Sequence, residues 1–444
     1  GESGSGKSQT VFAMTGLLDH NGKASGSVKF NGQEILNLPN NDLNSIRAEK
    51  IAMIFQDPMT ALNPAKRCGA QVDEILIYQF GLSKEKAKAK TLELFEQVKL
   101  PDPNSIYRRY PHQLSGGQMQ RVMIAMAISC APKLLIADEP TTALDVTVQK
   151  DIIELLMEIR AKTEMSMIFI SHDLALVSEI AHEILVMYQG RIVEKGNPKA
   201  IFLNPKDEYT KALIAARPKG DLRLKSLATV ASIKDKSFTP ELYSAQQRGA
   251  KHQQIYLKEP ILRVHNLSKA FFQKPFLFGK KQITKAVEQV SFSVYEGETV
   301  GLVGESGCGK TTLVKTLLQL EKASSGSVYY KGQDISQLSS AQWRHLRKDI
   351  QIIFQDPYSS LNPRMTIGKA IEEPMHVHRL HEKRLRRDKV VELLERVGLG
   401  AEHYGRYPHE FSGGQRQRVG IARALAVEPR FIVCDESVSA LDVS

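Results

Sequence analysis

The sequence predicts two consecutive α/β domains of one fold, each with a mainly parallel sheet, a helical subdomain and a smaller antiparallel part. The first observation is an internal repeat: residues 1–8 return as 304–311, and residues 115–118 return as 412–415. The second is the alternation of short apolar runs with amphipathic stretches, which is typical of strands connected by helices. A spacing of about 300 residues indicates a duplicated domain, because solenoid repeats are only about 20–50 residues long.

The domain boundaries follow from where the composition changes. We expect the first domain to cover residues 1–216, a linker to cover 217–258, and the second domain to cover 259–444. The linker stretch is polar and rich in lysine, without sustained apolar periodicity. The chain begins at the first residue of one repeated motif, so we also expect the natural protein to be longer at both ends. The first domain would then be N-terminally truncated and the second C-terminally truncated.

Local patterns predict individual elements in chain order. Asn31 and Gly32 separate two short runs and predict a tight hairpin turn. Residues 134–137 and 167–170 are apolar throughout, as expected for strands that are buried on both faces. Residues 261–264 resume a strand pattern after the linker. Helical spacing of apolar side chains predicts helices over residues 119–128, 148–159 and 416–426.

The composition narrows the function class. The chain is 42% hydrophobic and 25% charged, as in soluble globular proteins, and no apolar run approaches the roughly 18 residues of a membrane helix. A net charge of +11 would suit nucleic acid or anionic lipid, but the basic residues are spread out, which favours an ordinary solvated surface. We therefore expect no nucleic-acid partner. The four cysteines are too far apart to suggest a disulfide framework or a metal site.

Residues 1–8 and 304–311 both match the pattern G-x-x-x-x-G-K-[S/T]. The glycines let consecutive backbone N–H groups curl around phosphate oxygens, and the positive end of the following helix points at the same anion. Lys7 and Lys310 would reach the β- and γ-phosphates of a nucleotide, while Ser8 and Thr311 would ligate Mg²⁺. Two such matches at corresponding places in a repeat predict two nucleotide sites.

Each half also contains an apolar strand that ends in two carboxylates, Asp138-Glu139 and Asp435-Glu436. The carboxyl end of a parallel strand lies at the sheet edge where such folds bind ligands. The first acid of each pair would orient hydrated Mg²⁺, and the second would activate the attacking water as a general base. The alternative, an acidic turn in solvent, is disfavoured beside two phosphate loops.

A third motif, Ser-Gly-Gly-Gln, opens a predicted helix in each half. A helix start of this kind binds anions, although in isolation the motif would indicate an ordinary helix cap. A domain that already has a phosphate loop has no evident use for a second one in the same site. The motif therefore favours a role at a different site, across an interface.

The order of these motifs resembles the nucleotide-binding domains of ABC transporters, over nearly the whole chain outside the linker. The resemblance implies ATP and Mg²⁺ as cofactors and an ATP sandwich formed by the two halves within one chain. It implies that Glu139, Glu436 and His172 are catalytic, and that Ser8, Gln56, Thr311 and Gln355 contact the metal. Phe271 stands where an adenine-stacking aromatic is expected, with a plain core phenylalanine as the alternative.

The resemblance divides the site residues between two composite sites. Site one would use the first phosphate loop with the signature motif of the second half: Gly1, Ser3, Gly4, Ser5, Gly6, Lys7, Ser8, Gln56, Asp138, Glu139, His172, Ser412, Gly413, Gly414, Gln415 and Asp442. Site two would use the reverse combination: Gly304, Ser306, Gly307, Cys308, Gly309, Lys310, Thr311, Gln355, Asp435, Glu436, Ser115, Gly116, Gly117, Gln118 and Asp145.

Further segments resemble importers of dipeptides, oligopeptides and nickel, namely residues 55–64, 354–363 and 209–216. The implied function is to energise uptake of short peptides, including glutathione-type solutes, at the cytoplasmic face of the bacterial inner membrane. The implied partners are two transmembrane permease subunits and a periplasmic or lipid-anchored solute-binding protein. The alternatives are a soluble tandem ATPase that acts on ribosomes and an ATPase of a sugar or nickel importer.

Overall fold

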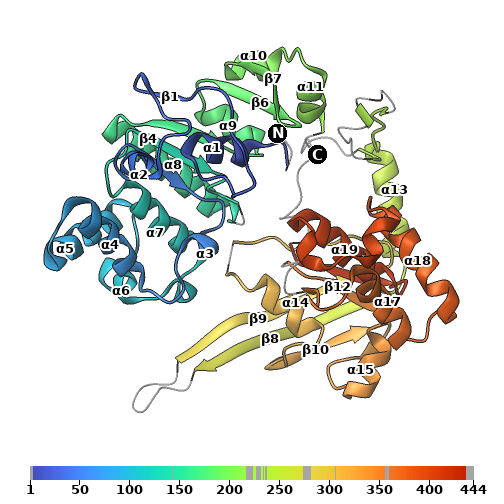
Figure 1. Cartoon of the computed structure of the whole chain (residues 1–444). Coiled ribbons are helices and arrows are strands. Elements are labelled where there is room, and N and C mark those ends of the chain that lie inside the picture. The colour runs from blue at the N-terminus through green and yellow to red at the C-terminus, as the bar shows by residue number, and fades with distance from the viewer. Residues whose placement is uncertain are drawn as a thin grey trace. The chain divides into compact units, whose positions relative to one another are not determined.

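The computed structural model describes most of the chain, which forms two compact units that divide between Leu242 and Tyr243 (Figure 1). The described residues are 4–142, 144–216, 224–226, 232–233, 235, 238–273, 282–305, 307–355 and 360–436. The division lies inside the stretch that the sequence predicts to be a linker.

The centre of the first unit is a three-stranded parallel sheet in the order β3-β4-β5. These strands are almost entirely apolar, and their register pairs Ile54 with Ala137 and Asp138 with Ile170. The strands and the helices that flank them in the chain are β3 (Ile51–Ile54), β4 (Leu134–Asp138), β5 (Ser166–Ile170), α1 (Lys7–Thr15), α2 (Asn40–Glu49), α8 (Val146–Thr163) and α9 (Leu174–Ile180). The predicted strands at 134–137 and 167–170 and the helix at 148–159 are confirmed. The first strand is buried apart from Leu134, whereas in the second only Ile170 is buried and residues 167–169 are partly exposed.

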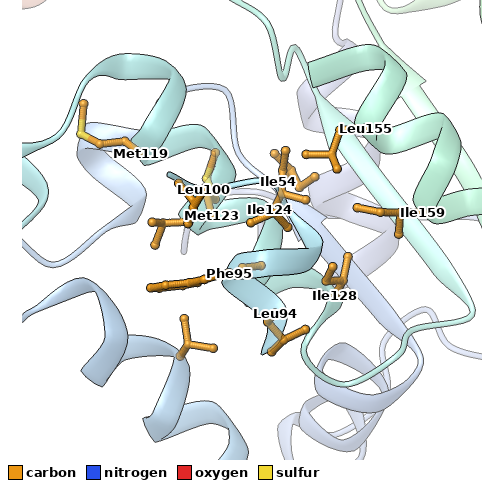
Figure 2. Close-up of a cluster of buried hydrophobic side chains, with 14 of the residues drawn as sticks. Ile54, Leu94, Phe95, Leu100, Met119, Met123, Ile124, Ile128, Leu155 and Ile159 are labelled. Carbon is orange, nitrogen blue, oxygen red and sulfur yellow. The ribbon is translucent and has the colours of Figure 1, made fainter. Parts of the chain in front are cut away.

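Short helices between β3 and β4 form a separate layer that shares one apolar core with the sheet. Figure 2 shows part of this core, where Phe95, Met123 and Ile124 pack beneath Ile54 of the sheet. All but Met123 of these are fully buried, and Met123 is 4% exposed. The helices are α3 (Pro58–Ala61), α4 (Cys68–Phe80), α5 (Lys84–Gln97), α6 (Pro103–Arg108), η1 (Pro111–Gln113) and α7 (Gly116–Ile128).

Two small antiparallel hairpins complete the sheets of the first unit. Asn31 and Gly32 both have positive φ, 49° and 81°, and connect β1 (Lys29–Phe30) to β2 (Gln33–Glu34), as the Asn-Gly pair predicts. The second hairpin and the helices after it pack around buried Tyr209 in a cluster of their own. These elements are β6 (Ile184–Tyr188), β7 (Arg191–Gly196), α10 (Pro198–Leu203) and α11 (Glu208–Ala215).

The second unit opens with a helix that the sequence pattern does not reveal, α13 (Ala245–Tyr256), inside the predicted linker. Its start is a capping box in which Ser244 accepts from the N–H of Gln247 and the Gln247 side chain accepts from the N–H of Ser244. The helix buries none of its side chains, so it has no apolar periodicity to detect. The boundary predicted at residue 259 therefore differs from the structural division by this helix.

The remaining described elements of the second unit share a parallel pair and a helical layer with the first, but their antiparallel sheet is larger. A four-stranded antiparallel sheet has the order β11-β10-β8-β9, and a parallel pair is formed by β12 and β13. The strands are β8 (Leu262–Gln273), β9 (Gln282–Val294), β10 (Ser325–Tyr330), β11 (Gln333–Asp334), β12 (Ile350–Ile353) and β13 (Phe431–Cys434). The helices are α14 (Lys310–Leu317), α15 (Ser340–Leu346), α17 (Ile367–Val377), α18 (Lys383–Arg396), η2 (Ala401–Gly405), η3 (Pro408–Glu410) and α19 (Gly413–Leu425).

One contact in the helical layer occurs in both units. A Cβ on Gly69 of α4 would lie 2.1 Å from the ring of Tyr107, and a Cβ on Gly368 of α17 would lie 2.5 Å from the ring of Tyr404. Each tyrosine hydroxyl donates to a carboxylate one turn further along the same helix, Asp73 in the first unit and Glu372 in the second. Only glycine leaves room for these rings, so the two helical layers are built in the same way.

Candidate nucleotide sites

The first phosphate loop ends in α1, whose first helical residue is Lys7. Gly4 and Gly6 have φ of 78° and 89°, a left-handed conformation that favours glycine over any residue with a Cβ. The first N–H groups of a helix have no partner within the helix, so they are available to an anion. In the second unit Gly307 and Gly309 have φ of 77° and 101° before α14. A Cβ on Gly309 would lie 2.1 Å from the carbonyl oxygen of Ala286.

A hydroxyl and a buried carboxylate meet at the start of each of these helices. Ser8 Oγ donates to Asp138 Oδ1 at 3.0 Å, and Thr311 Oγ1 donates to Asp435 Oδ1 at 3.1 Å. Burial raises the pKa of Asp138, a rise that the Ser8 hydrogen bond opposes and the neighbouring Glu139 charge reinforces. Hydroxyl and carboxylate oxygens are ligands that Mg²⁺ prefers, so these residues fit the metal that the sequence predicts.

Glu139 follows Asp138 and lies where four side chains converge. Its Oε2 accepts from Thr142 Oγ1 at 2.9 Å and from Gln56 Nε2 at 3.1 Å, and His172 Nδ1 lies 3.1 Å away. Its Oε1 lies 4.0 Å from Lys7 Nζ. Burial alone would raise the pKa of Glu139, but the contacts with His172, Thr142 and Lys7 outweigh burial and lower it. The carboxyl is therefore ionised near neutral pH, as a general base requires.

The parallel sheet explains why these residues meet. Gln56 lies two residues after β3, Glu139 directly follows β4 and His172 follows β5, so all three lie at the carboxyl edge of the sheet. The N–H of Glu139 donates to the carbonyl of Ile170 at 3.0 Å, which extends the ladder to this point. Glu139 itself has φ of 46° and Glu436 has φ of 47°, a strained conformation for a residue other than glycine.

The second unit repeats part of this arrangement. Gln355 Nε2 donates to Glu436 Oε2 at 2.5 Å, as Gln56 does to Glu139. Lys310 Nζ donates to the carbonyls of Gly304 and Glu305 of its own loop, at 2.7 and 2.8 Å. Cys308 is exposed, and its Sγ lies 3.9 Å from the same ammonium group. Both units thus pair a phosphate-loop hydroxyl with an aspartate and a glutamine with a glutamate.

The Ser-Gly-Gly-Gln motifs form capping boxes at the start of α7 and α19. Ser115 Oγ accepts from the N–H of Gln118 at 3.3 Å, and Ser412 Oγ accepts from the N–H of Gln415 at 3.3 Å. Among the described residues, no hydrogen bond or ion pair joins either motif to the phosphate loop of its own unit. Asp145 similarly caps α8 and accepts from the N–H of Val148 at 2.9 Å. The predicted role of these residues at a second site stays a prediction.

Some predicted site residues lie elsewhere. Phe271 lies on β8, where it is 39% exposed and Lys269 Nζ is 4.8 Å from its ring centroid, so it is not a core phenylalanine. Its stacking on adenine stays a prediction. Gly1, Ser3, Ser306 and Asp442 lie outside the described residues.

Two contacts near the first site have no counterpart among the sequence predictions. Thr142 donates to Glu139, and a hydroxyl three residues after the acid was the available signal. The N–H of Gly190, in the turn between β6 and β7, donates to the carbonyl of Ser5 at 3.1 Å. Gly190 lies far from the motifs in the chain, so no local pattern indicates that it supports the phosphate loop.

Comparison with known proteins matches both units to one family. The ABC transporter family profile matches residues 1–142 and 287–439. The glutathione import ATP-binding protein GsiA of Salmonella paratyphi A is 46% identical over 453 residues, which cover all of this chain and 72% of that protein. The protein of the same name from Pectobacterium atrosepticum is 45% identical over 454 residues, with the same coverage.

A solved structure, the dimeric post-hydrolysis state of an ATP-binding cassette bound to ADP and phosphate, is 28% identical. It covers 44% of this chain and 82% of its own, with a TM-score of 0.40. Within the described part of the chain, no helix has the length and apolar character needed to cross a membrane.

The family profile covers both phosphate loops and both Asp-Glu pairs. The chain therefore belongs to the ABC transporter family and carries the ATP-hydrolysing domain of that family twice.

Proposed function

We propose that this chain is the ATPase subunit of an importer of short peptides of the glutathione class. The subunit would lie at the cytoplasmic face of the inner membrane. The observation that carries the proposal is the contact of two adjacent acids with the phosphate loop: the ionised, partly buried Glu139 lies 4.0 Å from Lys7 Nζ, and the buried Asp138 accepts from the Ser8 hydroxyl. The identity of 46% with a glutathione import protein extends over the whole chain, which supports the class of solute.

The geometry supports a direct attack of water on the γ-phosphate. Lys7 and the N-terminus of α1 would hold the phosphates, and Ser8, Gln56 and Asp138 would hold Mg²⁺, which would supply positive charge to stabilise the phosphate oxygens. Glu139 accepts one proton of the water as the new P–O bond forms. The bond between the γ-phosphorus and the bridging oxygen breaks, and ADP leaves with the electron pair. His172 contacts the γ-phosphate in this proposal.

The proposal includes closure of each site by the other half. Ser412, Gly413, Gly414 and Gln415 complete site one, and Ser115, Gly116, Gly117 and Gln118 complete site two. The support is chemical: each motif begins a helix whose first N–H groups suit an anion, and neither contacts the phosphate loop of its own unit in the described structure.

Membrane subunits require a docking surface, and the first unit has a groove of about 480 Å³ that suits one. Its lining is mostly apolar and includes Phe55, Met53, Met126 and Tyr78. Phe55 precedes Gln56, and the Gln56 amide contacts Glu139. A segment bound in this groove would therefore be connected to the catalytic carboxylate through Phe55 and Gln56. We assign the groove to a cytoplasmic segment of a permease subunit. The solute-binding protein would act on the far side of the membrane.

Uptake of solute tests the proposed function. A strain that lacks the gene should fail to accumulate labelled glutathione, and the wild-type gene should restore uptake. Excess unlabelled dipeptide should compete, whereas maltose and nickel should not. Restoration of sugar or nickel uptake instead of glutathione uptake would contradict the assigned solute. Co-sedimentation of the protein with ribosomes and not with membranes would contradict the importer.

The groove has a matched pair of variants. Tyr78 in the groove is 82% exposed and Leu203 on α10 is 81% exposed, so a charge at either position leaves the core intact. Tyr78→Glu should weaken co-purification with the permease and reduce uptake by about tenfold or more, as expected for a buried charge without a partner. Leu203→Glu should leave both unchanged. Equal behaviour of the two variants would remove the groove from the proposal.

A further inference from the structure

Thr142 occupies a defined position relative to the catalytic carboxylate. The N–H of Thr142 donates to the carbonyl of Glu139 at 3.1 Å, which closes a turn with Pro140 at its second position. Proline favours this position of a turn because its φ is already fixed. The same turn brings the Thr142 hydroxyl to 2.9 Å from Glu139 Oε2, so the carboxylate is held by its own backbone segment.

The two oxygens of Glu139 have different surroundings. Thr142, Gln56 and His172 all contact Oε2, whereas Oε1 lies toward Lys7 of the phosphate loop. The roles assigned above give Gln56 to Mg²⁺ and His172 to the γ-phosphate, so both side chains have other partners when nucleotide is bound. Those roles give Thr142 no second partner among the described residues, so its hydroxyl remains beside Oε2.

The duplicated half provides a second observation. Ser439 stands at the position that corresponds to Thr142, so both copies have a hydroxyl three residues after the acid. The two positions between them differ: Pro140 corresponds to Ser437, and Thr141 corresponds to Val438. A hydroxyl is therefore kept at the one position of this segment that contacts the acid in the first unit.

We infer that Thr142 is a positioning residue for hydrolysis: its hydroxyl holds Glu139 Oε2 and so directs Oε1 toward the water that attacks the γ-phosphate. A carboxylate without this contact rotates more freely about its last torsion, and a smaller fraction of bound nucleotide meets a correctly oriented base. Nucleotide binding does not depend on the contact. The inference rests on the ATPase activity proposed above.

The test uses the full-length protein in its membrane complex, with steady-state kcat and KM for ATP in excess Mg²⁺. Thr142→Val combined with Ser439→Ala removes both hydroxyls and should lower kcat by about tenfold, the effect of one hydrogen bond to a charged group. The KM should change by less than about twofold, because phosphate contacts are retained. Thr142→Ser should retain turnover close to that of the wild type.

Thr141→Val is the matched control, because Thr141 is the adjacent residue, is buried, and has valine as its counterpart in the second half. It should leave kcat and KM unchanged. Full kcat in the double variant, an equal loss in the control, or a loss that lies in KM would overturn the inference.

Thermal melting of each variant guards against a folding defect. If the double variant melts early, Thr142→Cys with Ser439→Cys replaces it, since a thiol is a weaker donor in a similar volume. Turnover at the wild-type level in that variant would also overturn the inference. A wild-type complex without ATPase activity contradicts the proposed function itself. Suppose that the wild type is active, that Glu139→Gln combined with Glu436→Gln is inactive, and that Thr142→Val combined with Ser439→Ala is fully active. This result contradicts only the role of Thr142.

Discussion

At the scale of single residues, the first site depends on competition between burial and hydrogen bonding at two adjacent acids. Burial is the largest influence on both acids. It raises the pKa of Asp138, whereas at Glu139 the contacts with His172, Thr142 and Lys7 together outweigh burial and lower the pKa. The aspartate donates nothing and accepts from Ser8, while the glutamate faces the phosphate loop. Two neighbouring carboxylates therefore have environments that suit a metal ligand and a base respectively.

Replacement of the proposed bases tests this division of roles. Glu139→Gln and Glu436→Gln should each reduce turnover at their own site by at least about 10²-fold, the usual contribution of a general base. Nucleotide affinity should be retained, because the phosphate loop and Ser8 are unchanged. The measurements are steady-state ATPase rate and equilibrium binding of a fluorescent nucleotide. Wild-type turnover in the double variant would exclude both glutamates as bases.

Most of this site could be predicted, but from two kinds of signal. The place of Asp138 and Glu139 follows from an apolar strand that ends in two acids, because parallel strands bring their carboxyl ends to one edge of the sheet. Gln56 and His172, which follow neighbouring strands, were implied by the resemblance to ABC domains. The ion pair of Lys7 with Glu139 and the support of the loop by Gly190 could not be predicted. Both depend on side-chain placement or on contacts between segments far apart in the chain.

At the scale of elements, helix starts combine stability with candidate function. Ser115 caps α7, and Ser83 caps α5 by accepting from the N–H of Lys86 at 3.4 Å. Both serines satisfy an N–H group that the helix itself leaves without a partner. Only Ser115 belongs to a motif that the ABC resemblance assigns to nucleotide.

The two caps give a paired prediction. Ser115→Ala and Ser83→Ala should each reduce the free energy of unfolding by about 1 kcal/mol, measured by urea denaturation without nucleotide. Only Ser115→Ala should also reduce ATP turnover. Equal turnover in the two variants would show that Ser115 acts as a helix cap and nothing more.

Elements with one apolar face are predicted from the sequence, and those without one are missed. The buried strand β4 and the amphipathic helix α8 follow directly from their spacing of apolar residues. The helix α13 is missed because none of its side chains is buried, although its Ser-x-x-Gln start is a recognisable capping box. In a polar segment such as α13, the capping residues therefore indicate a helix that apolar periodicity does not.

At the scale of the whole molecule, the resemblance to ABC domains predicts that each phosphate loop meets the signature motif of the other half. The chain has a native thiol in the second phosphate loop, Cys308, which is exposed. The other accessible thiols can be replaced by residues of the other half, Cys434→Ala and Cys130→Val, since Ala137 and Val427 occupy the corresponding positions. This background leaves Cys308 and the buried Cys68.

Ser115→Cys in this background should be joined to Cys308 by a short bifunctional thiol reagent when ATP is present, since ATP would lie between them. Ser412→Cys, which belongs to the same half as Cys308, should not be joined to it. The products are separated by gel mobility and identified by mass spectrometry of the linked peptides. Linkage of Cys308 to Ser412→Cys instead would mean that each half closes its own site.

The glycine–tyrosine contacts of the two helical layers also have a historical meaning. The ring of Tyr107 lies against Gly69, and the ring of Tyr404 lies against Gly368 at the matching place in the other half. Separate origins would require the same glycine, the same aromatic and a nearby acid to arise twice. One origin in a single-domain ancestor, before the gene doubled, requires each change only once. The glycine–tyrosine contact is therefore older than the tandem protein. The difference between Thr141 and Val438 arose after the two copies began to diverge.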